Sequence, residues 1–250
     1  MRSEATATNS DNMKTHFLRA EWNNLIMANY IVSKELLLPY LPYKTELDFF
    51  DGNSYVSLVG FMFLNTRIFG FSIPYHMNFE EVNLRFYVKY NDGGYWKRGV
   101  VFIKELVPKQ GISIIANTLY GENYVTLKMK HYHFDSGEYL EAGYEWEYKN
   151  KWNKLSATTD KKSSPISKAS HEEFIAEHYW GYTKYSDNKT YEYEVKHPAW
   201  ETLKVVNYSI DCDFGPLYGD QFSILNNTKP KTVFMTKGSE VKVHYKKALE

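Results

Sequence analysis

The segment NFEEVNLRFYV, residues 78–88, combines strand-forming residues with two glutamates, an asparagine and an arginine. Side chains alternate between the two faces of a β-strand. Alternation places four apolar side chains on one face, and Glu81, Asn83, Arg85 and Tyr87 on the other. A row of carboxyl, amide, guanidinium and phenol groups is typical either of a solvated sheet face or of the wall of a polar cavity.

The segment RGVVFIKELVP, residues 98–108, is predicted to be the antiparallel partner of this strand, after a turn in NDGGYWK. Strict alternation places Lys104 and Glu105 on opposite faces. Whichever face is interior then holds a charge that needs a partner. We expect Arg85 to pair with Glu105, or Glu81 to pair with Lys104.

These residue types indicate chemistry on an organic acid or a carbonyl compound. A guanidinium at Arg85 can hold a carboxylate, and we assign Asn83 and Lys104 to ligand binding beside it. Glu81 and Glu105 are candidate acid–base groups if burial raises the pKa of their carboxyls.

A further candidate follows the second strand, where Pro108 precedes Lys109. A lysine among apolar groups, or beside another cation, has a lowered pKa and can form a Schiff base with a carbonyl compound. The alternative is that Lys109 is a solvated loop lysine.

Other candidate sites have ordinary explanations. His131 and His133 share a strand face, as two metal ligands could, but no third ligand is identifiable, and we predict no metal. Cys212 lies between two aspartates, which raise the pKa of a thiol and disfavour a nucleophilic role. We interpret His178 as an imidazolium that interacts with a helix C-terminus. The sequence lacks the glycine-rich and zinc motifs of common cofactor sites, so no cofactor is predicted.

The elements that must position these residues are mostly strands, as 22 tyrosines, 15 phenylalanines and six tryptophans favour. Short helices are predicted in residues 33–42, 111–121 and 170–180, the last opening with a capping box of Ser170 and Glu173 and breaking at Gly181. The polar segment 150–169 is predicted to be a long loop. Residues 1–12 are expected to be disordered, and residues 13–247 to form one α+β domain of mainly antiparallel strands.

The composition limits the partners. The chain carries 30 basic and 30 acidic residues, which argues against nucleic-acid binding and against a basic membrane-binding surface. A single cysteine fits a reducing compartment, and no apolar run reaches the length of a membrane span. We therefore expect a soluble, cytoplasmic protein whose partner is a small molecule. The many aromatic residues are compatible with a homodimer.

Six segments resemble the YqjF-like family of bacterial proteins, a domain of unknown function. They run in order from about residue 16 to about residue 245 and read HFLRAEWNNLIMANY, YVSLVGFMFLNTRIFG, NFEEVNLRFYV, RGVVFIKELVPK, EEFIAEHYWGYT and DCDFGPLYG. The resemblance implies a fold similar to acetoacetate decarboxylase, a closed, cone-like antiparallel β-barrel with helices outside and a cavity within. In such a fold the row from Glu81 to Arg85 would face an enclosed polar cavity.

The resemblance also bears on Lys109. Acetoacetate decarboxylase forms a Schiff base through the first lysine of a Pro-Lys-Lys motif after a strand, and KELVPKQG looks like a shortened version of that segment. Gln110 stands where the second lysine would lower the pKa of the first. The leading hypothesis is a barrel that binds a small organic acid or carbonyl compound. If the protein is an enzyme, we expect decarboxylase- or aldolase-like chemistry through Lys109. The alternatives are a non-catalytic binding or sensor module, and a solvated sheet face without a ligand.

Overall fold

A computed structural model describes residues 16–249, so the predicted tail over residues 1–12 lies outside the described part of the chain. The described residues form one sheet of fifteen strands. The strands are β1 (His16–Val32), β2 (Thr45–Leu47), β3 (Ser54–Ile68), β4 (Phe71–Ser72), β5 (Phe79–Asp92), β6 (Tyr95–Val107), β7 (Tyr124–Thr126), β8 (Lys128–Asp135), β9 (Tyr139–Tyr148), β10 (Lys151–Pro165), β11 (Trp180–Ser186), β12 (Lys189–Lys196), β13 (Glu201–Asp211), β14 (Thr232–His244) and β15 (Lys247–Ala248).

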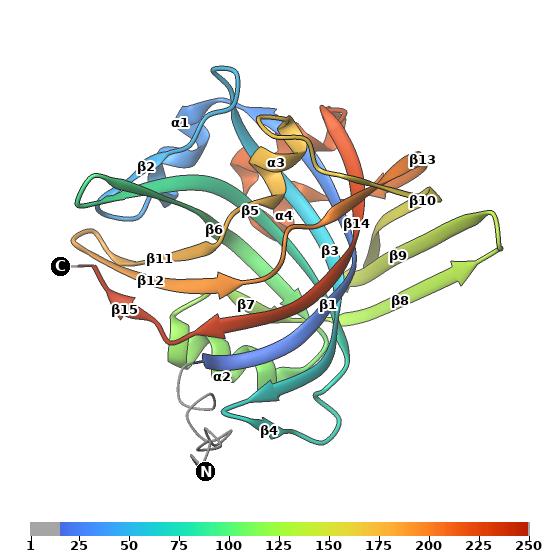
Figure 1. Ribbon diagram of the computed structural model, residues 1–250, viewed down its shortest axis with the longest axis horizontal. Coiled ribbons are helices and arrows are strands. Elements are labelled where there is room, and N and C mark those ends of the chain that lie inside the picture. Colours follow the sequence, from blue (N-terminus) through green and yellow to red (C-terminus); the bar gives the residue numbers. More distant parts are fainter. Residues whose placement is uncertain (1–15, 250) are drawn as a thin grey trace, which may run out of the picture.

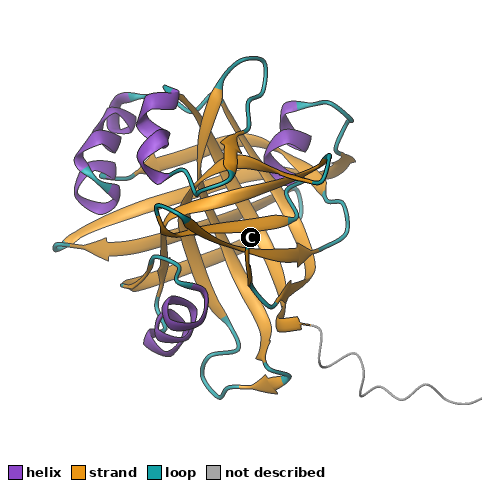
Figure 2. Ribbon diagram, turned by 90° about the vertical axis from the view of Figure 1, so that its left-hand side faces the viewer, coloured by secondary structure: helices purple, strands orange, loops and turns teal. Residues whose placement is uncertain are grey.

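Short helices lie around the outside of the crossing strands (Figure 2). They are α1 (Lys34–Leu37), α2 (Gln110–Tyr120), α3 (His171–Ala176) and α4 (Phe214–Tyr218), with 3-10 turns η2 (Leu38–Tyr40) and η3 (Asp220–Asn227). None of these helices is long and apolar enough to cross a membrane. The mainly antiparallel sheet with few helices agrees with the predicted fold class.

The strand order brings distant segments together (Figure 1). It runs β15-β12-β11-β6-β5-β3-β1-β14-β13-β10-β9-β8, and β12 also pairs with β14. A hydrogen-bonded ring is therefore formed by seven strands, β12, β11, β6, β5, β3, β1 and β14. The sheet continues beyond this ring through β13, β10, β9 and β8. Only the contacts of β6 with β11 and with β7 are parallel among the described pairs.

The central strands are buried on both faces. β5 is buried from Phe79 to Val88, including its polar residues. One face, with Leu84 and Phe86, packs into a cluster that includes Trp146 of β9 and Phe214 of α4. The opposite face belongs to a second cluster inside the ring. A strand between two cores cannot show a solvated face, so the polar row must be interior.

Two predicted helices are present, each with one predicted end: the C-terminal end of α2 and the N-terminal end of α3. α2 ends where Gly121 adopts a left-handed φ of 71°, and its N–H bonds the Asn117 carbonyl oxygen. At the start of α3, the Ser170 hydroxyl accepts from the Glu173 N–H at 3.1 Å. The Glu173 carboxylate accepts from the Ala169 N–H, which completes the cap one residue earlier than in a standard capping box.

The predicted loop over residues 150–169 is wrong. Residues 151–165 form β10, which pairs with β9 on one side and β13 on the other. Leu155 and Ala157 are buried, and so are Asn153 and Thr159. Small hydroxyl residues can occupy a central strand when both neighbours satisfy its backbone, and their polarity hid the strand in the sequence.

The predicted helix up to Gly181 is shorter than expected. It ends at Ala176, and β11 begins at Trp180. A Cβ atom at position 181 would lie 2.2 Å from the ring of Tyr193 on β12, so only glycine allows the two strands to approach this closely. The early end of α3 places His178 in the connection between α3 and β11.

Candidate functional site

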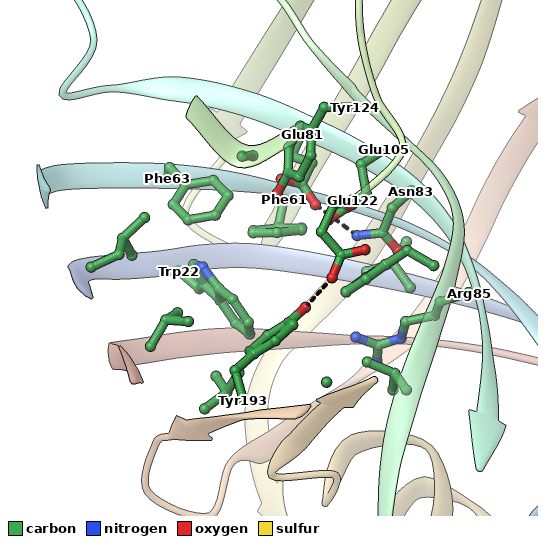
Figure 3. Close-up of a pocket in the computed structure, with 18 of the residues that line it drawn as sticks. Trp22, Phe61, Phe63, Glu81, Asn83, Arg85, Glu105, Glu122, Tyr124 and Tyr193 are labelled. Atoms are coloured by element: carbon green, nitrogen blue, oxygen red, sulfur yellow. Dashed lines mark hydrogen bonds between the residues drawn. The ribbon is translucent and has the colours of Figure 1, made fainter. Parts of the chain in front are cut away.

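A cavity of about 110 Å³ lies inside the ring of strands (Figure 3). Its wall is mainly aromatic and aliphatic, and its polar members come from five places in the chain. These are Glu81, Asn83 and Arg85 of β5, Glu105 of β6, Glu122 and Tyr124 at the start of β7, His178 before β11, and Tyr193 and His197 in and after β12.

Three of the four residues of the polar row of β5 line this cavity, and Tyr87 does not. Glu81, Asn83 and Arg85 are only 2%, 1% and 8% exposed. The structure therefore selects the interior-wall alternative for this strand face and excludes the solvated sheet face. Three polar side chains at alternating positions face the same cavity, and alternation along β5 predicted that they share one face.

A β-bulge brings Glu105 to the same space. Asn83 pairs with Glu105 and Leu84 with Lys104, but Arg85 pairs with Phe102. The extra residue in β6 breaks strict alternation, so Phe102 and Glu105 both line the cavity. Strict alternation placed Phe102 and Glu105 on opposite faces of β6, and this prediction is wrong. The prediction that Lys104 and Glu105 point to opposite sides is confirmed.

The two candidate lysines lie apart from the cavity. The Lys104 ammonium donates to the Leu217 carbonyl of α4, on the opposite side of the sheet. Lys109 precedes α2 as its half-buried N-cap residue. The residues of α2 that line the cavity are Ile112, Ile115 and Ala116. The positions of these lysines do not support the ligand-binding role given to Lys104 or the Schiff-base role given to Lys109.

Neither predicted ion pair forms among the described residues. The Glu81 carboxylate accepts from Asn83 Nδ2 at 2.8 Å and from the Tyr124 hydroxyl at 3.0 Å. Arg85 Nη2 donates to the Ile175 carbonyl oxygen at 3.4 Å, and Nε has no hydrogen-bond partner among the described atoms. The buried Arg85 guanidinium thus lacks a carboxylate partner, which is rare for a charge removed from water.

Two further residues of the site, Glu122 and Tyr124, were not predicted from the sequence. Glu122 Oε1 accepts from the Thr183 hydroxyl at 2.6 Å and from the Tyr193 hydroxyl at 2.9 Å. Glu122 is 8% exposed, and Tyr124 is half-buried. The only signal was a glutamate and a tyrosine directly after the helix-ending Gly121, and this pattern also fits an ordinary loop.

Burial and crowding raise the pKa of all three carboxyls. Loss of hydration raises the pKa of Glu81 to about 7, although hydrogen bonds from Asn83 and Tyr124 oppose the shift. Burial likewise raises the pKa of Glu122 to about 7. The pKa of Glu105 lies well above its ordinary value, because burial is reinforced by the charges of Glu122 and Glu81. Near neutral pH the site therefore holds protons that can be exchanged.

His178 differs from its predicted role. Its side chain is 2% exposed, and Nε2 lies 3.8 Å from Asp48 Oδ2, too far for a hydrogen bond. Burial lowers the pKa of His178 to about 4, so the imidazole is neutral at pH 7 and does not act as a cation at a helix end. Asp48 is instead paired with Arg98 Nε at 2.6 Å.

The remaining motifs have separate environments. His131 Nδ1 lies 3.0 Å from Glu80 Oε2, and His133 Nδ1 lies 2.5 Å from the Asn24 amide. The two histidines therefore contact different residues. Cys212 is buried, and burial together with the charges of Asp213 and Asp211 raises the pKa of its thiol. The two flanking aspartates in the sequence predicted this direction.

Solved structures of the same fold are enzymes with acetoacetate decarboxylase-like architecture. The acetoacetate decarboxylase of Legionella pneumophila aligns with a TM-score of 0.64 and 15% identity, over 100% of this chain and 98% of that chain. The enduracididine biosynthesis enzyme MppR, complexed with pyruvate, aligns with a TM-score of 0.65 and 12% identity, over 94% and 91%. An acetoacetate decarboxylase-like enzyme from Sphingomonas wittichii RW1 aligns with a TM-score of 0.64 and 10% identity, over 99% of this chain and 100% of that chain.

The sequence itself has closer relatives. It is 29% identical over 190 residues to the uncharacterized protein YqjF of Bacillus subtilis (strain 168). The alignment covers 73% of this chain and 74% of YqjF. The model of the DUF2071 family, described as an uncharacterized conserved protein, matches residues 19–240. The chain therefore belongs to the DUF2071 family and has the acetoacetate decarboxylase-like fold.

Proposed function

We propose that this protein binds a small organic acid or carbonyl compound in the cavity, with Arg85 holding a carboxylate. The observation that carries the proposal is the Arg85 guanidinium, which is 8% exposed and has only the Ile175 carbonyl as an oxygen acceptor among the described residues. A buried guanidinium is stabilised when a carboxylate accepts two of its N–H groups. The ring from β12 to β14 supports a closed, cone-like barrel as the container for this ligand.

The carboxyl groups supply proton transfer in this proposal. A group with a pKa near 7 can give or take a proton at neutral pH, which suits Glu81 for general acid–base catalysis. Burial also raises the pKa of Glu105 well above its ordinary value, which makes Glu105 the second candidate for acid–base catalysis, and Asn83 binds the ligand beside it. Binding without turnover would make the protein a binding or sensor module instead.

A pyruvate-bound neighbour supports the class of ligand only at the level of the fold, because its identity to this chain is 12%. The single domain over residues 13–247, the homodimer, the cytoplasmic location and the absence of nucleic-acid partners stay predictions.

We expect Arg85→Gln to abolish ligand-induced stabilisation. Wild type and variant would be heated with pyruvate, lactate, acetoacetate and larger organic acids, and the shift of Tm would be measured for each. Loss of a charge-assisted pair should weaken binding by about tenfold or more. Arg67→Gln, at an exposed arginine of β3, is the control and should keep every shift. Equal shifts in wild type and the Arg85 variant would contradict the proposal.

We expect no imine at Lys109. Intact mass would be measured after borohydride reduction with keto acids and ketones, for wild type and Lys109→Ala. No described lysine lines the cavity, so no reduced adduct is expected. An adduct that disappears in Lys109→Ala would show that this side chain does reach the ligand, and would restore the Schiff-base hypothesis.

A further inference from the structure

The charges around the cavity do not balance. Among the described residues that line it, Glu81, Glu105 and Glu122 face a single guanidinium, Arg85. The two lining histidines add little positive charge, because burial lowers the pKa of both. A ligand with only a carboxylate would satisfy Arg85 but would add negative charge to a site that already has three acidic groups.

The polar atoms without partners are complementary to a ligand that both accepts and donates hydrogen bonds. Within the described part of the chain, Arg85 Nε is a donor without a partner, and Glu105 Oε2 and Asn83 Oδ1 are acceptors without a partner. Glu105 and Asn83 are 2% and 1% exposed, and they face each other across β5 and β6. Buried polar atoms that lack a partner destabilise the protein, so a ligand that pairs them gains affinity.

The apolar part of the wall lies on the other side of the site. Figure 3 shows Arg85 on one side of the cavity, Trp22 and Phe63 on the opposite side, and Glu122 between them. The Trp22 ring packs 5.1 Å from the Phe61 ring and 5.9 Å from the Phe63 ring, measured between centroids. These rings form an apolar surface suited to a ligand body without charges.

We infer that the ligand is an amino-carboxylic acid, with a protonated amine beside the carboxylate and an apolar side chain. This inference rests on the proposed function and names its substrate class. The carboxylate pairs with Arg85, the ammonium donates to Glu105 and Asn83, and the side chain packs on Trp22 and its aromatic neighbours.

Binding of an ammonium group then changes the protonation of the site. The titratable and charged groups that line the cavity are Glu81, Glu105, Glu122, Tyr124, Tyr193, His178, His197 and Arg85, and Lys246 acts on Glu122 from nearby. The carboxyls hold protons near neutral pH because burial outweighs the attraction of Arg85 for Glu81 and of Lys246 for Glu122. An ammonium inside the cavity adds a further positive charge beside these carboxyls, so they ionise and release protons when the ligand binds.

The test uses five compounds that share one phenyl-bearing body and differ in the polar end: phenylalanine, phenyllactate, phenylpyruvate, 3-phenylpropionate and phenethylamine. Isothermal titration at pH 7 in phosphate and in Tris gives both the Kd and the number of protons released, since the two buffers differ in ionisation enthalpy. We expect phenylalanine to bind at least about tenfold more tightly than 3-phenylpropionate or phenethylamine, with proton release.

The variant Glu105→Gln distinguishes the contribution of the ligand's amine to binding from the contribution of its carboxylate. The variant keeps the size of the side chain but cannot carry a negative charge. It should reduce the affinity for phenylalanine about tenfold and leave 3-phenylpropionate nearly unchanged. Glu138→Gln, in the exposed turn between β8 and β9, is the matched control and should bind like wild type.

The outcomes separate the inference from the proposed function. Equal affinity for phenylalanine and 3-phenylpropionate, without proton release, would overturn the amine and leave an organic-acid site. Arg85-dependent Tm shifts with pyruvate or lactate, but no binding of any phenyl compound, would overturn the apolar side chain as well. Absence of Arg85-dependent binding for every acid tested would remove the proposed function and this inference together.

Discussion

Glu122→Gln should make the folded protein more stable than wild type at pH 8, by about 3 kcal/mol, and equally stable near pH 4.5. The pKa of Glu122 is raised from 4.5 to about 7 in the folded state. A shift of this size corresponds to about 3 kcal/mol, at about 1.4 kcal/mol for each pH unit. Glutamine keeps an amide oxygen that can accept from Thr183 and Tyr193, so the variant removes the titration without removing those bonds.

The sign follows from the protons bound in each state. Between pH 4.5 and 7 the folded state keeps the Glu122 proton while the unfolded state has lost it, so this group makes unfolding easier as pH rises. His178 acts in the opposite direction, because its pKa is lowered to about 4 and the unfolded state binds its proton first. The difference between variant and wild type cancels His178 and leaves Glu122, together with the effect of its charge on the pKa of Glu81 and Glu105.

The free energy of unfolding would be measured in urea from pH 4.5 to 8 for wild type, Glu122→Gln and Glu138→Gln. The exposed control should follow wild type at every pH. Parallel curves for wild type and Glu122→Gln would show that this carboxyl has an ordinary pKa. The inference of exchangeable protons in the cavity would then lose its physical basis.

Gly99→Ala should destabilise the protein by about 3 kcal/mol, the upper part of the range for an overpacked core. Gly99 of β6 pairs with Trp180 of β11, one of the two residue pairs that join these strands. A Cβ atom at this position would lie 2.5 Å from the Trp180 carbonyl oxygen and 2.6 Å from the Tyr182 ring. Backbone must move to relieve the first contact, and the movement displaces β11 from the ring.

Gly111→Ala is the matched control for this prediction. Its Cβ atom would meet only the His76 side chain, at 2.9 Å from Nε2, and that half-exposed ring can move. Alanine is about 1 kcal/mol more favourable than glycine inside a helix, so this variant of α2 should be as stable as wild type or more stable. If urea unfolding gave the same stability for both alanine variants, the close approach of β6 and β11 would not be needed for the fold.

Local patterns along the chain predicted those features that depend on neighbours in sequence. Alternation identified β5 and its polar row, and Gly121 and Ser170 marked helix ends that the structure confirms. The same reasoning failed for β10, where serine and threonine residues outnumber apolar ones and pairing with β9 and β13 decides the conformation. Propensity is weak where hydrogen bonding from both sides fixes the strand.

The candidate site shows the same division. The sequence by itself determined that Glu81, Asn83 and Arg85 share one strand face, because the period of a strand is two residues. Tertiary structure decided that this face is interior, since β5 lies between two buried clusters. It also decided which groups join the row: a bulge turns Glu105 inward and Lys104 to the other side, and β7 brings Glu122. Such placements depend on pairing between distant segments, which no local pattern encodes.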